Sequence, residues 1–219
     1  MGVDLPATVR VVVVRGEGRA FSAGLDRAAF DGGADGTPAL ATIAAQSPEQ
    51  ASTTIATYQA GFGWLARPDL VSVAVVRGHA IGAGFQLALA CDLRIGSDDA
   101  QFTMAETSLG LVPDLGGTKR LVELVGYSRA VEICLTGRRV PADEAYRMGL
   151  LATVVPADQL DDVVDATLAA LLKPPRDAVI ETKALLRTAA GQSQSAQEVA
   201  EREAQYRLLR SLAGLVAES

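Results

Sequence analysis

Two valine-rich runs, at residues 9–14 and 70–76, are the clearest strand signals in the chain. Both are apolar at consecutive rather than alternate positions, which is typical of strands buried on both faces of a sheet. Shorter strands are predicted in "DLRIGS" and "AQFTM", on either side of a turn at residues 97–99, and an extended piece in "LATVVP". The pattern therefore predicts several short strands distributed along the first three quarters of the chain.

Helical periodicity separates these strands. Ser47, Pro48 and Gln50 form a helix start, with serine as the N-cap, proline at the first position and glutamine three residues after the cap. The helix is predicted to continue on one apolar face formed by Ile55, Tyr58, Phe62 and Leu65. Further helices are predicted at residues 85–90, from "TKRLVELVGYSRAVEICLTG" onward, and at about 157–172, 176–190 and 196–215. Residues 21–30 are interpreted as a short helix-like piece, and the Gly/Ala-rich residues 31–46 as a flexible loop.

One supersecondary unit occurs twice. "VVVVRGEGRAFSAG", residues 11–24, and "VAVVRGHAIGAG", residues 73–84, share a strand, an Arg-Gly turn and a closing Ala-Gly. A strand, a glycine turn and a helix start repeated in this way indicate a repeat architecture. Chance similarity between two valine-rich strands is the alternative.

Composition narrows the class of protein. The 219 residues are 49% apolar and 21% charged, and a net charge of −6 without a basic run argues against nucleic-acid binding. Cys91 and Cys134 form no CxxC pair, and His79 is the single histidine, so no metal site is predicted and both thiols are expected to be free and buried. With no signal peptide and no apolar run long enough to span a bilayer, we expect a soluble cytoplasmic protein.

The common motifs of enzyme active sites are absent. Neither glycine turn has the third glycine of a dinucleotide fingerprint, because Phe21 and Leu87 occupy the required positions. No P-loop, HExxH or GxSxG sequence occurs. His79 is more simply a hydrogen-bonded structural residue than a catalytic base. Phosphate cradles, zinc peptidases and serine hydrolases are therefore disfavoured.

Backbone donors and carboxylates supply the remaining chemistry. A glycine turn at a helix start presents N–H groups that have no partner within the helix, and these suit a carbonyl oxygen that becomes an enolate. Leu25 and Ala83 occupy such positions in the two turns, although both turns could instead be tight connections. Glu106 and Asp114 lie in one segment and could transfer protons, or could be a loop acid and a turn residue.

Four segments together resemble the crotonase, or enoyl-coenzyme A hydratase/isomerase, superfamily: "GRAFSAGLD", "GHAIGAGFQLALACDLRI", "AQFTMAETSLGLVPDLGGTKRL" and "LTGRRVPADEAYRMGLLATVVP". The resemblance implies an α/β fold, a spiral of ββα repeats followed by C-terminal helices. It implies a spiral core with the acyl-CoA site in residues 1–140 and a helical trimerisation region in residues 141–219, in a homotrimer or homohexamer. The strand pair and helix that usually begin the family are expected to be missing.

The resemblance also assigns the site. The backbone N–H groups of Leu25 and Ala83 would form an oxyanion hole for the thioester oxygen of an acyl-CoA, and the loop at about 27–46 would border the acyl pocket. Coenzyme A would enter as part of the substrate, with no other cofactor and no metal. The residues expected along the coenzyme are Ser22, Ala23, Asp26 and Gly82. Lys183 could meet a coenzyme phosphate, but a solvated helix lysine is the simpler interpretation.

The hydratases of the family use two glutamates, and this chain has Gln86 at one place and Glu106 at the other. Because an amide cannot accept a proton near neutral pH, the resemblance favours double-bond isomerisation with Glu106 as the base and Asp114 assisting. A hydratase in which Gln86 orients the water, and a non-catalytic acyl-CoA-binding protein, are the alternatives.

Overall fold

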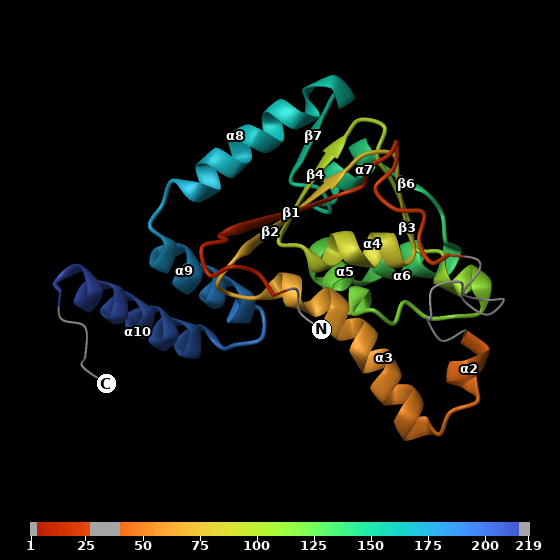
Figure 1. The fold of residues 1–219 in the computed structure, drawn as a ribbon, viewed down its shortest axis with the longest axis horizontal. Coiled ribbons are helices and arrows are strands. Elements are labelled where there is room, and N and C mark those ends of the chain that lie inside the picture. The colour runs from red at the N-terminus through yellow and green to blue at the C-terminus, as the bar shows by residue number, and fades with distance from the viewer. Residues whose placement is uncertain (1–3, 27–39, 215–219) are drawn as a thin grey trace.

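The structure, a computed structural model, describes residues 4–26 and 40–214. Two sheets and the helices around them form an α/β fold (Figure 1). The four-stranded sheet is parallel throughout, in the order β1 (Val11–Arg15), β2 (Val71–Val76), β4 (Leu93–Ser97) and β7 (Thr153–Val155). The three-stranded sheet has the order β3 (His79–Ile81), β5 (Gln101–Thr103) and β6 (Val140–Pro141). The strands predicted from the apolar runs are confirmed.

The strand β2 is the centre of the larger sheet. All six of its residues are buried, and Val73 is in register with Val13 of β1 on one side and Leu93 of β4 on the other. The prediction of a strand buried on both faces is thus confirmed for β2. In β1 both faces also pack against a core, Val12 and Val14 on one and Val11 and Val13 on the other, but the valines are only half-buried.

Each face of the larger sheet packs on a different core, as the alternation of side chains along a strand requires. Ala74 and Val76 belong to the main core, which also contains the helix α4 (Ala83–Ala90). The opposite face packs against the helix α8 (Leu160–Leu172) through Val73, Val75, Ile95, Leu160 and Val164. The sheet therefore supports the start of α4, and that start is where the second glycine turn lies.

The predicted helices have clear sequence causes. The helix α3 (Pro48–Gly63) begins with a complete capping box in which Ser47 and Gln50 exchange hydrogen bonds. Gly126, at φ +80°, separates α5 (Gly117–Val125) from α6 (Tyr127–Thr136). Short helical segments are η1 (Trp64–Ala66), η2 (Glu106–Leu109), η3 (Ala157–Gln159), α2 (Leu40–Ala44) and α7 (Ala142–Arg147). The helices α8, α9 (Arg176–Ala189) and α10 (Gln194–Leu212) confirm the three predicted near the C-terminus.

Figure 1 shows α8, α9 and α10 on one side of the molecule, with α10 lying beside α9. No helix within the described ranges is long and apolar enough to cross a membrane.

Two local predictions are wrong. Residues 40–44, expected in a loop, form α2, because Ala, Leu and Ile without glycine or proline favour a helix. Residues 21–26, expected to belong to a helix-like piece, contain no helix, and Ser22 forms a parallel bridge to Ala80. Pairing with a neighbouring chain segment overrides local helix propensity here. The rest of the predicted loop and helix-like piece, at residues 27–39, lies outside the described residues.

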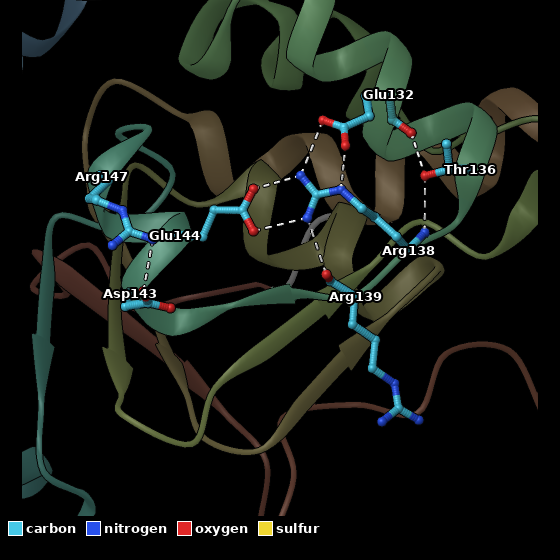
Figure 2. Close-up of polar contacts among 7 residues, drawn as sticks. All are labelled: Glu132, Thr136, Arg138, Arg139, Asp143, Glu144 and Arg147. Carbon is cyan, nitrogen blue, oxygen red and sulfur yellow. Dashed lines mark hydrogen bonds and ion pairs between the residues drawn. The ribbon is translucent and has the colours of Figure 1, made fainter.

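An ion-pair network fixes the corner between α6 and α7 (Figure 2). The guanidinium of Arg138 donates to both oxygens of Glu132 and to both oxygens of Glu144. These carboxylates raise the pKa of Arg138, and Arg138 in turn lowers the pKa of Glu144. This corner continues into β6, and β6 pairs with β5. The network therefore lies next to the strand that precedes Glu106.

Candidate active site

The second glycine turn connects β3 to α4. Gly82 lies at φ +52°, a backbone conformation that favours glycine, and its N–H donates to the carbonyl of Thr103 at 2.8 Å. A Cβ at position 82 would lie 3.3 Å from Glu106 Oε1. Ala83 is the first residue of α4, so its N–H belongs to the group that a helix leaves unpaired. The turn thus brings an available backbone donor close to a carboxylate.

The first glycine turn packs directly against the second. Ser22 N–H donates to the carbonyl of His79 at 2.9 Å, and its own carbonyl accepts from the N–H of Ile81 at 3.0 Å. Glycine is required at both contact points: a Cβ on Gly24 would lie 2.7 Å from the Ile81 oxygen, and one on Gly84 would lie 2.5 Å from Ser22 Cβ. The two turns therefore lie side by side, as the oxyanion-hole hypothesis requires.

The residues predicted along the coenzyme all belong to these turns. Ser22 is half-buried, Ala23 and Asp26 are exposed, and Gly82 is buried. Leu25 follows Gly24 and its side chain is 48% exposed. Residues 21–26 contain no helix. The helix predicted to begin after Leu25 would fall in residues 27–39, outside the described residues, so the helix-start position of its N–H stays a prediction.

Glu106 lies at the start of η2, opposite the second turn. Its Oε1 accepts a hydrogen bond from Gln86 Nε2 at 2.7 Å. Its Oε2 is buried and accepts no hydrogen bond from the described residues. The next residue, Thr107, anchors the segment by donating its hydroxyl to the carbonyl of Cys134 at 2.6 Å. The carboxylate therefore has one oxygen in use and one available.

Hydrogen bonds fix both ends of the amide of Gln86. It is 1% exposed, and its Oε1 accepts from the N–H of Leu115 at 2.8 Å and from that of Gly117 at 3.3 Å. Because backbone N–H groups can only donate, these contacts identify the amide oxygen and direct the NH₂ group to Glu106. Gln86 thus links three segments, α4, η2 and the start of α5.

Asp114 immediately precedes this link. It is half-buried, and its backbone carbonyl accepts from Gln59 Nε2 of α3 at 2.7 Å. Its neighbour Leu115 provides one of the two N–H groups that hold Gln86. The structure therefore brings Gln86, Glu106 and the Asp114 segment together.

The two thiols are free, as predicted: Cys91 is buried and Cys134 is half-buried. Burial raises the pKa of Cys91 to about 12. Burial also raises the pKa of the Cys134 thiol, and the negative charge of Glu106 raises it further. Neither thiol is therefore suited to act as a thiolate near neutral pH.

Sequence reasoning was wrong about Lys183. Its side chain is 9% exposed rather than solvated, and its Nζ donates to the carbonyls of Arg67 and Leu70 and to Asp92 Oδ2, each at 2.6 Å. Burial lowers its pKa, while Asp92 acts in the opposite direction. Spacing along the sequence contains no signal for this pair, whose members are 91 residues apart.

His79 is also placed differently from the prediction. It lies exposed in β3, and its ring makes no hydrogen bond to the described residues. No group of three or more His, Cys, Asp or Glu residues in the described part of the chain could hold a metal ion.

Comparison with known proteins identifies the family. The enoyl-CoA hydratase/isomerase family matches residues 4–213. A probable enoyl-CoA hydratase of Mycobacterium tuberculosis is 35% identical over 158 residues, which is 72% of this chain and 56% of that protein. The short-chain-enoyl-CoA hydratase of Clostridioides difficile is 42% identical over 113 residues, 52% of this chain and 72% of that protein. The matched segment thus spans little more than half the length of the mycobacterial relative.

Comparison with solved structures supports the same family. A candidate enoyl-CoA hydratase of Thermobifida fusca in complex with acetoacetyl-CoA is 51% identical, with a TM-score of 0.89 over 94% of this chain and 80% of that chain. An enoyl-CoA hydratase of Bacillus anthracis is 28% identical, with a TM-score of 0.79 over 94% of this chain and 75% of that chain. These likenesses confirm the crotonase resemblance and the α/β fold with C-terminal helices. The chain belongs to the enoyl-CoA hydratase/isomerase family.

Proposed function

We propose that this chain isomerises a double bond in an acyl-CoA thioester, with Glu106 as the proton-transferring group. The backbone N–H groups of Leu25 and Ala83 hold the thioester oxygen while it carries the charge of an enolate. The observation that carries the proposal is Glu106 Oε2: it is buried without a hydrogen-bond donor among the described residues, and it belongs to a carboxylate 3.3 Å from the Cβ position of Gly82.

The reaction needs a hole for the enolate and one group that moves a proton. The base takes the α-proton of a 3-enoyl thioester, and the C–H electron pair passes into the dienolate, whose oxygen accepts hydrogen bonds from the two N–H groups. The proton then returns at the γ-carbon, so that a conjugated 2-enoyl thioester results with no net change in atoms. Donors already in place where the charge develops stabilise the transition state without further reorganisation.

The amide at position 86 favours isomerisation over hydration. Gln86 cannot take or give up a proton near neutral pH, and its side chain is 1% exposed with its oxygen already paired twice. A hydratase with Glu106 as its single acid is the second candidate function, because the related proteins include enzymes named as hydratases. Asp114, half-buried in the adjoining segment, is proposed as a second proton carrier.

The substrate class rests on the related Thermobifida fusca protein, solved with acetoacetyl-CoA and with CoA. We propose that coenzyme A reaches this chain as part of the substrate and that the turn residues Ser22, Ala23, Asp26 and Gly82 lie along it. The reaction as written requires no other cofactor and no metal, because proton transfer next to a thioester involves no redox step.

A substrate panel tests the proposal. The purified chain is offered 3-enoyl, 3,5-dienoyl and 2-enoyl thioesters of CoA in D₂O, with absorbance of the conjugated product and deuterium incorporation followed together. We expect formation of a conjugated product from the 3-enoyl or 3,5-dienoyl thioester. Water addition to the 2-enoyl thioester alone would favour the hydratase, and binding without turnover or exchange on any of them would leave a binding protein.

A further inference from the structure

Gln86 is the polar side chain most completely fixed around Glu106. It lies in the main helix of the core, between Phe85 and Ala88, which are both fully buried. The two halves of its amide make different contacts, since the oxygen accepts from two backbone N–H groups and the nitrogen donates to Glu106. The amide oxygen, paired twice, and the N–H directed at Glu106 are thus both committed to the protein.

The start of α5 is built around this side chain. A Cβ on Gly117 would lie 2.8 Å from Gln86 Cγ and 3.0 Å from its Oε1. Glycine at position 117 therefore lets the backbone approach closely enough to donate to the amide oxygen. The neighbouring residue Thr118 is exposed, so the close approach is confined to one position.

The direction of the amide decides which oxygen of Glu106 carries a proton. Because Nε2 is a donor at all relevant pH values, it can hold Oε1 as an acceptor both when the carboxyl is ionised and when it is neutral. In a neutral carboxyl the carbonyl oxygen is the better acceptor, so the hydrogen bond from Gln86 to Oε1 favours a proton on Oε2. The oxygen left unpartnered in the structure is thus the one suited to exchange protons with a substrate.

From this geometry we infer that Gln86 is a positioning residue, which reserves Glu106 Oε1 and makes Oε2 the proton-transferring oxygen, and that Gly117 holds Gln86 in place. The inference rests on the proposed function, because it assigns a role within that same reaction. An amide cannot act as the second acid of a hydratase, and in this inference Gln86 instead positions Glu106.

Two variants and one control test it. Gln86→Met removes the donor at nearly the same volume, and Gly117→Ala displaces Gln86 without touching Glu106. Thr118→Ala, one position further along α5, is the matched control. For each, kcat and KM for the active thioester, deuterium exchange and the melting temperature are measured.

We expect Gln86→Met and Gly117→Ala each to lower kcat and exchange at least tenfold with KM changed less than twofold, because a displaced catalytic group loses rate rather than substrate binding. Thr118→Ala should match the wild type. Since Gly117 acts through Gln86, the double variant should be no slower than Gln86→Met alone.

Wild-type kcat in both single variants, or losses that multiply in the double variant, would overturn the inference while the proposed function stands. A wild-type chain that turns over none of the thioesters would overturn both. If Gln86→Met loses its cooperative melting transition, Gly117→Ala decides the matter, because alanine is well tolerated in a first helical turn.

Discussion

Gly84→Ala tests whether the two glycine turns work as one unit. The added methyl would lie 2.5 Å from Ser22 Cβ and 2.6 Å from Ser22 Oγ. Carbon atoms in contact prefer a separation of about 3.5–4.0 Å, so the turns must move apart by about 1 Å. The neighbouring residues Leu25 and Ala83, whose N–H groups are proposed to share one oxygen, then lose their mutual spacing.

The magnitude follows from the geometry. A misplacement of about 1 Å in a catalytic arrangement costs about 100-fold in rate, and removal of one oxyanion-hole donor costs about 10²–10³-fold in kcat. We therefore expect kcat to fall about 100-fold. Overpacking in a core also costs roughly 1–3 kcal/mol of unfolding free energy, so the melting temperature should fall by several degrees.

The assay is conversion of the active thioester, followed by absorbance, beside thermal melting by circular dichroism. Gly63→Ala is the matched control, because a Cβ there meets nothing within 4 Å and the backbone is at φ −62°; its kcat should not change. Adding Ser22→Gly to Gly84→Ala removes the clashing side chain and should restore part of the rate. A Gly84→Ala enzyme with kcat within threefold of the wild type would refute the coupling of the turns.

Further predictions concern the acids, the buried lysine and assembly. Gln86→Glu supplies a second acid, so it should gain water addition to a 2-enoyl thioester, seen as loss of conjugated absorbance; no gain would contradict the role of the amide in disfavouring hydration. Lys183→Met leaves the half-buried carboxylate of Asp92 without its cation and should cost about 3 kcal/mol in denaturant unfolding, the low end for a buried ion pair. A loss below about 1 kcal/mol would contradict the pairing. Because burial lowers the pKa of Lys183 in the folded chain, the unfolded chain binds more protons at pH values between this lowered pKa and about 10.4. The unfolding free energy of the wild type should therefore rise relative to that of Lys183→Met as the pH increases through this window. A constant difference between the two would argue against the lowered pKa. Tyr206 and Leu209 of α10 are 61% and 52% exposed, and their replacement by Glu should turn the expected trimer or hexamer into monomer in sedimentation velocity, whereas an unchanged species would place assembly elsewhere.

The local parts of the fold could be predicted from the sequence. The capping box at Ser47, the buried strand β2 and the break at Gly126 each depend on a few consecutive residues whose preferences agree with the final structure. The prediction of α2 as a loop was wrong because glycine-rich neighbours at 31–36 obscured a short run of helix-forming residues.

The parts that could not be predicted depend on contacts between distant segments. The bridge from Ser22 to Ala80 pairs the first turn with β3 across 58 positions, a contact that no local sequence preference indicates. Lys183 has the sequence environment of a surface helix and is buried only because Asp92 and two backbone carbonyls meet it there. The hydrogen bond between Gln86 and Glu106 likewise spans 20 positions, so the sequence could name both residues but not their contact.

The central claim is that Glu106 moves the proton of a thioester-bound substrate. The most direct measurement is solvent deuterium incorporation into a 3-enoyl-CoA thioester by Glu106→Gln, with affinity for the thioester measured in the same preparation by calorimetry. Proton transfer by a positioned side chain contributes about 10²–10⁴-fold, so we expect incorporation to fall at least 100-fold while the dissociation constant changes less than threefold. Incorporation at the wild-type rate would contradict the account.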